Sequence, residues 1–467
     1  MKRTLLCLLS LLLMAAGCRK PDTVPQEEPS GQSKETTYYA GLFAYSCMKG
    51  YYLWEKEVSD QLDNWKTGED PIAKVRAVRY KDSEGNDIDR WTELMDDYSS
   101  FLSSLTGNGR TFGFEFVLYR QENYVIPQVT FVYEGSPAQK ASLQRGDIIL
   151  KVDGARLTMD DYAAVLTEKL YDNPTTLSLE LADGSKRQLT ATQMYSNPVN
   201  VVSTFNVGDK TVGYLHFTNF TQEAAQDLEE AFLYTFTEKR IDELVLDLRY
   251  NTGGYVSTAV ALASLIAPPE VVEAKSVFNQ SVYNSRLSEM MDDSDCFDPE
   301  YLDANPGIKH LWVIVTGHSA SASESLICGL MPYMDVTLVG STTYGKFCGG
   351  YLLKAEDWYD ALAKETQEVD CEKGKEATAL WGIYVIASRY ADCNGETLSM
   401  PSGIPAHYEA VDNPNDGYPL GDPSETMLSV VLSLIENGSL PAAAPTKGAS
   451  GREELPFSKK SDGVLLY

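Results

Sequence analysis

Two short polar segments contain the residues of this sequence that could carry out nucleophilic chemistry. Residues 318–324 (HSASASE) follow the apolar stretch LWVIV and precede the apolar stretch SLICGLM. Residues 342–346 (TTYGK) follow the stretch VTLVG and end in Lys346. A serine hydroxyl needs a base to take its proton, and a lysine whose pKa falls on burial is neutral enough near pH 7 to do so. Serine paired with lysine is a known substitute for serine paired with histidine.

The serine run also fits a purely structural role. Serine is a favoured helix N-cap, and Ser321 followed three residues later by Glu324 has the pattern of a capping box. Capping is the commoner meaning of such a string. The lysine of the second segment is what favours a chemical role.

A third segment, residues 247–254 (DLRYNTGG), closes the apolar stretch ELVLDL and opens a predicted helix. Its glycines would leave backbone N–H groups at a positive helix end, which is the geometry of an oxyanion hole. Asp247, Arg249 and Asn251 alternate along the chain, so we expect them to brace this turn through a charge-assisted contact rather than to act in catalysis.

Other nucleophiles and metals are less well supported. His318 lies three residues before Ser321, on the opposite side of the expected turn, and GHSAS lacks the last glycine of a nucleophile elbow. Cys348 lies near Lys346, but no partner histidine can be named for it. The other three histidines show no spacing such as HExxH, which disfavours a zinc peptidase. The sequence implies no metal and no cofactor.

From about Pro198 onward, apolar stretches typical of strands alternate with stretches typical of helices. This alternation predicts a largely parallel sheet with helices on its faces. Ligand sites in such sheets gather at the carboxyl ends of the strands. All three polar segments fall at such ends.

Residues 107–193 have the texture of short strands separated by turns, with one helix candidate, MDDYAAVLTEKL. Within them, GSPA at 135–138, ASLQRGDII at 141–149 and VDG at 152–154 resemble the PDZ signature of bacterial proteases, although Ser142 stands where glycine is usual. The resemblance implies that Phe112, Gly113 and Phe114 form the carboxylate-binding loop. Such a domain adds a peptide tail to its sheet edge as an extra strand. The alternative is a module that only braces its neighbours.

The segments ELVLDLRYNTGG, SASASESLICGL and GSTTYGK together resemble the C-terminal processing peptidases, the tail-specific proteases of family S41. Three separated motifs agree in order and position, and the resemblance covers most of residues 38–435. It points to a lipoprotein subgroup in Bacteroides-type bacteria, and it implies a peptidase domain resembling the ClpP/crotonase-like fold.

The S41 resemblance also implies the roles of individual residues. Ser321 would be the nucleophile and Lys346 the base, and the backbone N–H groups of Gly254 and Ala322 would form the oxyanion hole. Many members of the family carry a glutamine four residues after the lysine to orient it, and here that position is Gly350. The group that orients Lys346 is therefore unassigned.

The chain begins with a short basic end, an apolar run and the small residues AAG before Cys18. This pattern predicts a lipoprotein signal peptide over residues 1–17, with Cys18 as the lipidated residue; a plain secreted protein is the alternative. Residues 18–36, rich in Pro, Glu, Gln and Ser, would be a tether. The bacterial cell envelope is the expected location, with the chain anchored by lipid to the outer membrane.

Length and composition limit the class of protein and its partners. The chain has 467 residues, of which 43% are hydrophobic and 23% charged. This amino-acid composition is ordinary for a globular protein, and the chain is long enough for several domains. A formal charge of −28 excludes nucleic acid as a partner. Six cysteines after Cys18 are scattered without a CxxC motif, so no disulfide can be assigned.

The predicted fold class is a multidomain α/β protein. The tether is followed by a helical N-terminal domain (37–106), the PDZ-like domain (107–193), a serine peptidase domain (194–439) and a C-terminal tail (440–467). The expected function is cleavage of extracytoplasmic proteins recognised through accessible C-terminal tails. The rival function is a non-catalytic lipoprotein that binds such tails. Chemistry on acyl-CoA lacks a basic patch for the cofactor's phosphates. The apolar end of the tail would either dock on the body or mimic a substrate tail.

Overall fold

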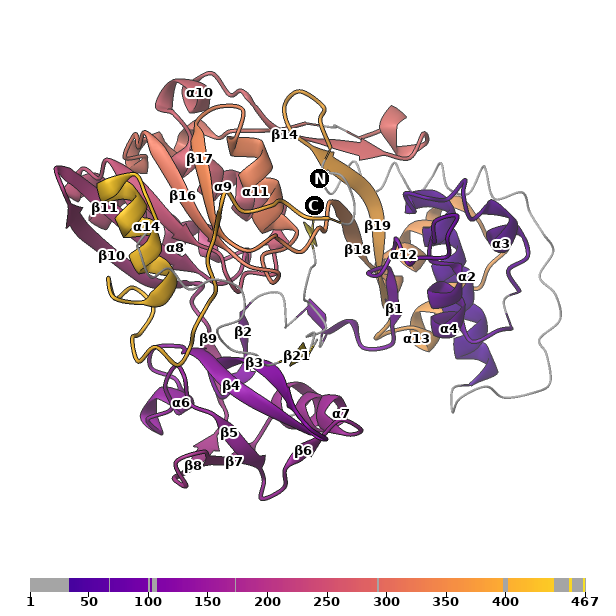
Figure 1. Ribbon diagram of the computed structural model, residues 1–467. Helices are drawn as coiled ribbons and strands as arrows, with labels where there is room; N and C mark the ends of the chain where they lie inside the picture. Colours follow the sequence, from indigo (N-terminus) through magenta and orange to yellow (C-terminus); the bar gives the residue numbers. More distant parts are fainter. Residues whose placement is uncertain are drawn as a thin grey trace.

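A computed structural model describes residues 33–66, 68–99, 101–102, 107–172, 174–291, 294–397, 402–440, 453–455 and 465–466. The predicted signal peptide, Cys18 and nearly all of the tether lie outside these residues. Figure 1 shows the parallel sheet with its helices on the left, the β-rich module below it and the N-terminal helices on the right. No helix in the described part of the chain is long and apolar enough to cross a bilayer.

The main sheet has the strand order β10-β11-β12-β16-β17-β20. Its strands are β10 (Val199–Val207), β11 (Lys210–Phe217), β12 (Glu243–Asp247), β16 (His310–Val315), β17 (Asp335–Gly340) and β20 (Tyr408–Glu409). From β11 to β20 all neighbours are parallel, and only β10 runs antiparallel. The sequence prediction of a largely parallel sheet is confirmed.

Helices cover both faces of this sheet because its central strands are apolar on both sides. Leu244 and Leu246 of β12 pack into the core that contains α9 (Val256–Ile266) and α11 (Ala322–Leu330). Val245, which points the other way, packs with α14 (Thr426–Asn437). The remaining helices of this part are α8 (Ala224–Ala231), η2 (Phe232–Thr237), α10 (Pro269–Glu273), η3 (Leu287–Glu289) and η4 (Pro299–Ala304).

A second, mostly antiparallel sheet stands beside the main one, in the order β13-β22-β18-β19-β14-β15, and β1 also pairs with β19. Its strands are β1 (Glu93–Met95), β13 (Gly254–Tyr255), β14 (Val277–Tyr283), β15 (Ser294–Cys296), β18 (Cys348–Lys354), β19 (Gly382–Ala391) and β22 (Leu465–Leu466). The segment after Lys346 therefore runs directly into this sheet.

The N-terminal helices pack onto the second sheet and share its core. They are α2 (Lys34–Tyr51), α3 (Ser59–Asp63) and α4 (Pro71–Val78), so the helical part begins just inside the expected tether. Phe43 of α2 is fully buried, with its ring 5.8 Å from that of Trp358 in α12 (Ala355–Glu365), which is followed by α13 (Cys371–Ala377). One continuous apolar cluster therefore joins these helices to the peptidase region.

The predicted helical character of residues 37–106 is partly wrong, because the segment after Trp91 is not all helical. Residues 93–95 form β1, which pairs antiparallel with residues 382–384 of β19. The apolar residues of this short stretch have helical spacing, but strand pairing with the free edge of β19 is more favourable than a helix here. Leu94 is buried in that pairing.

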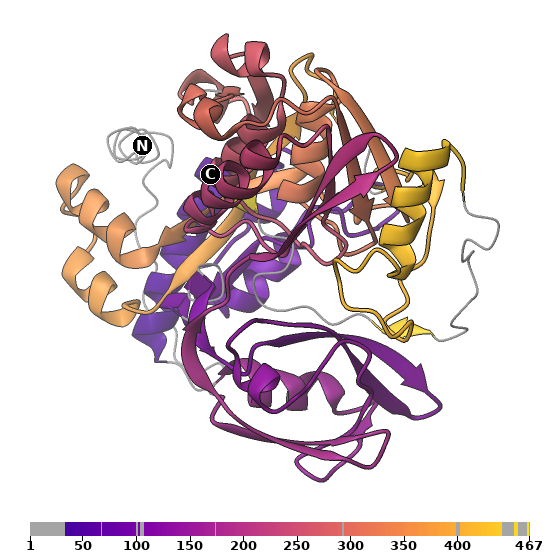
Figure 2. The ribbon, with the colours of Figure 1, turned by 90° about the vertical axis from the view of Figure 1, so that its left-hand side faces the viewer.

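The β-rich module has a core of its own and two small sheets, β21-β3-β4-β6 and β5-β7-β8. Its elements are β3 (Phe114–Gln121), β4 (Tyr124–Val132), α6 (Pro137–Lys140), β5 (Ile149–Val152), β6 (Leu157–Thr158), α7 (Tyr162–Leu166), η1 (Thr167–Asp172), β7 (Thr176–Leu181), β8 (Lys186–Thr190) and β21 (Glu454–Leu455). An antiparallel pair, β2 (Asn108–Thr111) with β9 (Thr192–Tyr195), joins its beginning to its end. Figure 2 shows the module hanging below the two larger parts.

Because the N-terminal helices share one core with the second sheet, the two should unfold together. We expect Phe43→Ala to lower the unfolding free energy by about 3–5 kcal/mol, the usual cost of emptying a buried phenylalanine site. Calorimetry should show one shifted transition for helices and peptidase region. An unshifted peptidase transition beside a separate, earlier melting of the helices would contradict the shared core.

Candidate active site

Ser321 lies at the sharp turn between β16 and α11. It caps the helix with φ 63° and ψ −112°, a backbone conformation that non-glycine residues rarely adopt. The residue is fully buried, and its Oγ makes no hydrogen bond with any residue that the structure describes. A strained backbone of this kind, here with a buried hydroxyl that has no partner among the described residues, is characteristic of functional sites.

The carboxylate of Glu324 joins the turn of Ser321 to the segment of Lys346. It accepts hydrogen bonds from the backbone N–H groups of Ser321 (2.9 Å), Gly345 (2.7 Å) and Lys346 (2.8 Å) and from Thr343 Oγ1 (2.5 Å). Burial raises the pKa of Glu324, and these four donors oppose that rise. The glutamate half of the predicted capping box is therefore present, as the bond from the Ser321 N–H to Glu324, and the same glutamate also positions the second segment.

Lys346 is fully buried, and burial lowers its pKa to about 8. Its Nζ donates to the Tyr384 hydroxyl at 3.3 Å and lies 5.0 Å from the centre of the Trp91 ring. It forms no ion pair with any carboxylate in the described part of the chain. The amine is therefore held among aromatic groups, where its neutral form is favoured.

Two of these neighbours escaped the sequence analysis. Trp91 and Tyr384 lie far from Lys346 along the chain, and no motif marked them. Tyr384 accepts a hydrogen bond from Lys346 Nζ, although no glutamine is present four residues after the lysine. At Gly350 a Cβ atom would lie 2.2 Å from the carbonyl oxygen of Val385, so no side chain fits there without moving β19.

The paired glycines lie against the Ser321 turn. A Cβ atom at Gly253 would be 2.7 Å from Ser321 Cβ and 3.1 Å from the backbone nitrogen of Ala322. Gly254 has φ 142°, and a Cβ there would meet the carbonyl of Phe220 at 2.2 Å. Ala322 is the first residue of α11, so its N–H has no acceptor within the helix. The structure thus places the first N–H of α11 and Gly253, the neighbour of the predicted donor Gly254, at the turn of Ser321.

The neighbouring serines hold loops in place. Ser319 Oγ donates to the carbonyl of Leu248 at 2.7 Å, and Ser323 Oγ donates to the carbonyl of Asn251 at 3.0 Å. Both hydroxyls are thereby committed to the backbone of the glycine-bearing segment. Of the three serines in the run, only Ser321 has a hydroxyl without a partner in the described chain.

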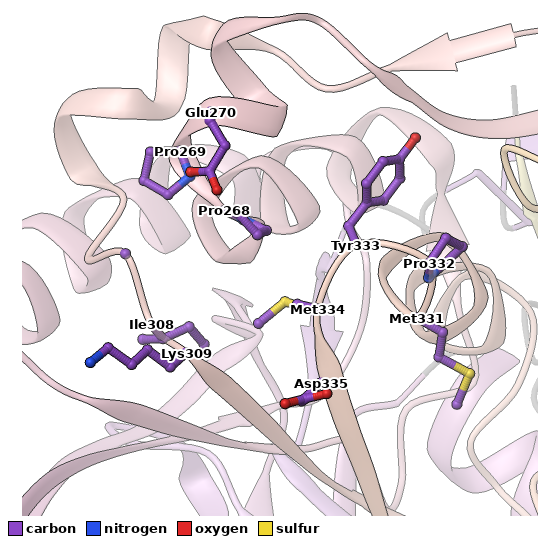
Figure 3. Close-up of a pocket in the computed structure, with 11 residues that line it drawn as sticks. Pro268, Pro269, Glu270, Ile308, Lys309, Met331, Pro332, Tyr333, Met334 and Asp335 are labelled. Carbon is purple, nitrogen blue, oxygen red and sulfur yellow. The ribbon is translucent and has the colours of Figure 1, made fainter.

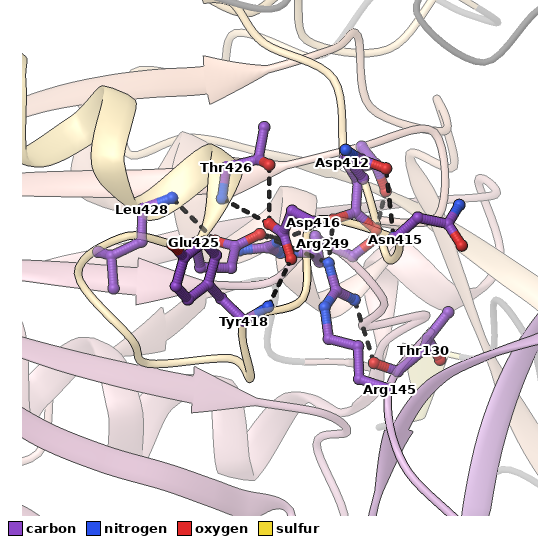
Figure 4. Close-up of polar contacts among 12 residues, drawn as sticks. Thr130, Arg145, Arg249, Asp412, Asn415, Asp416, Tyr418, Glu425, Thr426 and Leu428 are labelled. Atoms are coloured by element: carbon purple, nitrogen blue, oxygen red, sulfur yellow. Dashed lines mark hydrogen bonds and ion pairs between the residues drawn. The ribbon is translucent and has the colours of Figure 1, made fainter. Parts of the chain in front are cut away.

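Arg249 stands at the centre of a buried ionic network behind the glycines (Figure 4). It is fully buried and lies 2.7 Å from each of Asp247, Asp412 and Glu425. The predicted contact of Asp247 with Arg249 is confirmed. The expected share of Asn251 in that contact is wrong, because its side chain donates to the carbonyl of Phe217 and accepts from the N–H of Gly253.

The β-rich module reaches into this network through Arg145. Its guanidinium lies 2.6 Å from Asp412 and donates to the Tyr250 hydroxyl at 2.9 Å, next to Arg249 in sequence (Figure 4). Burial alone would raise the pKa of Asp412, but the two arginines lower it to about 2. A charged bridge therefore connects the module to the segment that carries the candidate oxyanion donors.

In the predicted carboxylate-binding loop, Phe112 and Phe114 pack into the core of the module. Gly113 has φ 77°, and a Cβ there would lie 2.3 Å from Ser136 Cβ, so glycine is required. The N–H of Gly113 donates to Thr111 Oγ1 at 3.1 Å. The loop leads directly into β3.

The alternative nucleophiles are not placed for catalysis. Cys348 is fully buried, and burial raises the pKa of its thiol to about 12. His318 Nε2 lies 2.6 Å from Glu454 Oε1 on the tail. Among the described residues no cluster of three or more His, Cys, Asp or Glu side chains could hold a metal ion.

An open surface pocket of about 610 Å³ lies away from the site (Figure 3). Its lining includes Lys309, directly before β16, and Asp335, the first residue of β17. These are the amino ends of parallel strands, whereas Ser321 and the glycines follow carboxyl ends. The pocket therefore belongs to the opposite edge of the sheet.

Family comparison agrees with this geometry. Residues 211–399 match the model of peptidase family S41, and residues 128–175 match that of the PDZ domain. The chain carries an S41 peptidase domain and a PDZ domain. It is 27% identical over 266 residues to a carboxyl-terminal-processing protease of Synechocystis sp., covering 55% of this chain and 58% of that protein. With the CtpA processing protease of Bacillus subtilis it shares 27% over 217 residues, covering 46% and 43%.

The chain thus spans about half the length of the curated relatives it matches. An S41 protease structure from Bacteroides fragilis NCTC 9343 covers 89% of this chain and 99% of its own, with a TM-score of 0.65 and 21% identity. That likeness concerns the fold. The predicted multidomain α/β class, with an S41 peptidase domain and a PDZ domain, is confirmed.

The buried amine of Lys346 should weaken the fold at neutral pH. Because its pKa is lowered from 10.5 to about 8, the unfolded chain binds more protons than the folded one between these values, so stability rises with pH across that window. We expect Lys346→Met to raise the unfolding free energy at pH 7 by on the order of 3 kcal/mol. Denaturant titrations at pH 7 and pH 10 measure both effects. A variant no more stable than the wild type would show that the amine is solvated.

Arg249 should be indispensable to the S41 domain. Arg249→Met leaves Asp247 buried without a cation and leaves Asp412 and Glu425 with Arg145 alone. Breaking a buried pair in this way costs about 3–5 kcal/mol. Chemical denaturation should show the loss. As a control, Arg76→Met removes an exposed contact with Glu93 and should change stability by less than about 1 kcal/mol. Equal effects of the two substitutions would mean that the network is not a structural support.

Proposed function

We propose that this chain is a serine endopeptidase of the C-terminal processing type. Ser321 is its nucleophile and Lys346 its general base, and the N–H groups of Gly254 and Ala322 form the oxyanion hole. The observation that carries the proposal is the pairing of an unengaged, strained serine with a buried amine whose pKa is about 8, both held by Glu324. The names of the curated relatives support the reaction class.

In the proposed reaction, Ser321 Oγ attacks the scissile carbonyl carbon while Lys346 Nζ takes the hydroxyl proton. The oxyanion accepts hydrogen bonds from Gly254 and Ala322, and the ammonium then gives its proton to the leaving amine. Water hydrolyses the acyl-enzyme with Lys346 again as base. In the structure Ser321 Oγ does not yet bond the amine, and such contacts often tighten only when substrate binds. Tyr384 positions the amine by accepting one of its N–H groups.

Substrates of the proposed enzyme are proteins with accessible C-terminal tails. The PDZ domain would take the tail at the β3 edge, below the loop of Phe112, Gly113 and Phe114, by adding it as a strand. Arg145 links that domain to the oxyanion segment, which gives tail binding a physical route to the site.

The proposal extends to location. A signal peptide over residues 1–17, lipidation of Cys18 and a tether up to the first helix would place the folded body at a membrane surface of the cell envelope. The remaining proposed domains are helical (37–106), PDZ (107–193), peptidase (194–439) and tail (440–467). The support for the signal peptide and the lipid anchor comes from the sequence alone, which has a short basic end, an apolar run and small residues before the cysteine.

The test is cleavage of an unfolded protein that ends in apolar residues, followed by mass spectrometry. We expect the full chain to cut it, with kcat/KM rising as pH increases toward about 8 because Lys346 must be neutral. Ser321→Ala and Lys346→Met should lose about 10³-fold or more. Ser323→Ala, the matched control, should lose far less because its hydroxyl only holds a loop. Tail binding without cleavage in every variant would support the non-catalytic binding protein instead.

A further inference from the structure

The tail of the chain occupies the free edge of the PDZ domain. β21 pairs antiparallel with β3, with Glu454 opposite Tyr119 and Leu455 opposite Leu118. The N–H of Arg120 donates to the carbonyl of Glu453 at 2.8 Å. Leu455 is 9% exposed and belongs to the apolar core of the domain. Without β21, β3 would be an edge strand with unpaired backbone groups.

This edge is the one at which a substrate tail would be added. β3 follows directly on the loop of Phe112 and Gly113, and β21 has the antiparallel direction that strand addition there requires. Figures 1 and 2 both show β21 beside β3, on the side of the PDZ domain that faces the rest of the molecule. Leu455 supplies the buried apolar anchor.

A second piece of the tail lies at the candidate active site. β22 is inserted between β13 and β18, parallel to both, with Leu465 opposite Gly254 and Leu466 opposite Tyr255 and Gly350. Gly254 is a proposed oxyanion donor, and β18 starts two residues after Lys346. The tail backbone therefore fills the gap between the two strands that border the site.

The tail also contacts the loop of the nucleophile. Glu454 Oε1 lies 2.6 Å from His318 Nε2, three residues before Ser321. Glu453 Oε2 lies 3.4 Å from Arg120 on the PDZ domain. Two adjacent glutamates thus contact the two domains that the proposed reaction uses.

We propose that Glu453–Leu455 and Leu465–Leu466 are an intramolecular ligand. It occupies the peptide-binding edge of β3 and the gap between β13 and β18, and it thereby competes with substrate for both. The inference rests on the proposed function, and its ligand class is an extended acidic-then-apolar peptide. Twelve residues, 441–452, join Leu440 to this ligand. A ligand tethered by a short linker acts at an effective concentration on the order of millimolar. A substrate at micromolar concentration competes poorly against it.

The experiment uses full-length chains and a labelled peptide with the sequence of residues 450–460 (SGREELPFSKK). Leu455→Asp removes the anchor from the PDZ core. Leu466→Pro removes a backbone N–H from β22, where proline disrupts strand pairing. Leu440→Asp is the matched control, because Leu440 is 42% exposed and precedes the tail ligand. Peptide binding and the kinetics of substrate cleavage are measured for each, with folding checked by circular dichroism.

We expect the peptide to bind Leu455→Asp at least tenfold more tightly than it binds the wild type or Leu440→Asp. For cleavage, Leu455→Asp and Leu466→Pro should lower KM by about tenfold with little change in kcat, since the tail competes with substrate rather than altering the chemistry. Equal peptide affinity in Leu455→Asp and the control would overturn the proposal, as would an unchanged KM in both tail variants.

The two proposals fail in different ways. If no variant cleaves any substrate, the enzymatic function is wrong, but the peptide-binding comparison still decides whether the tail is a ligand of the PDZ edge. If the wild type cleaves and the tail variants behave as the control in both assays, the function stands and the self-ligand is wrong.

Discussion

The burial of one carboxylate, that of Glu324, is the constraint on which the site depends. A buried carboxylate is costly unless it is hydrogen-bonded, and here its four donors come from the turn before α11 and from the loop after β17. The hydrogen bonds that stabilise the Glu324 carboxylate therefore fix the backbone of Ser321 relative to that of Lys346. Because the donors are N–H and O–H groups rather than the lysine ammonium, the amine gains no close ion pair, and burial lowers its pKa. The hydrogen bonds of Glu324 thus set the geometry of the proposed dyad, and burial sets the protonation of its amine.

The sheet supplies the frame for this constraint. Parallel strands β12, β16 and β17 deliver their loops to a common edge, so segments about 25 and 70 residues apart meet there. Behind them Arg249 is paired with three carboxylates in an interior that would otherwise exclude charge, and Arg145 joins the PDZ domain to the same cluster. This network is costly to break, because removal of Arg249 leaves Asp247 buried without a cation. It therefore makes the position of the PDZ domain dependent on the segment that bears the glycines.

Much of this could be predicted from sequence, because the local signals agreed with the final contacts. Apolar strands, a serine at a helix start and paired glycines after a strand all act within a few residues, and each was found where expected. Trp91 and Tyr384 were missed because their contact with Lys346 depends on tertiary packing that no spacing encodes. The strand at residues 93–95 was missed for the same reason, since the edge of β19 outweighed a helical spacing. The sequence left two interpretations of the tail open, docking and mimicry, and the structure shows β21 docked on β3 and β22 docked between β13 and β18.

The environment of Lys346 also depends on the N-terminal part of the chain. Trp91 precedes β1, and β1 is attached to β19, the strand that carries Tyr384. The aromatic faces that surround the amine are therefore positioned by a segment far from the catalytic motifs. Loss of the N-terminal part would expose the amine to water, return its pKa toward 10.5 and leave it protonated at neutral pH. The basicity that the proposed reaction needs is thus a property of the joined core, not of the three motifs alone.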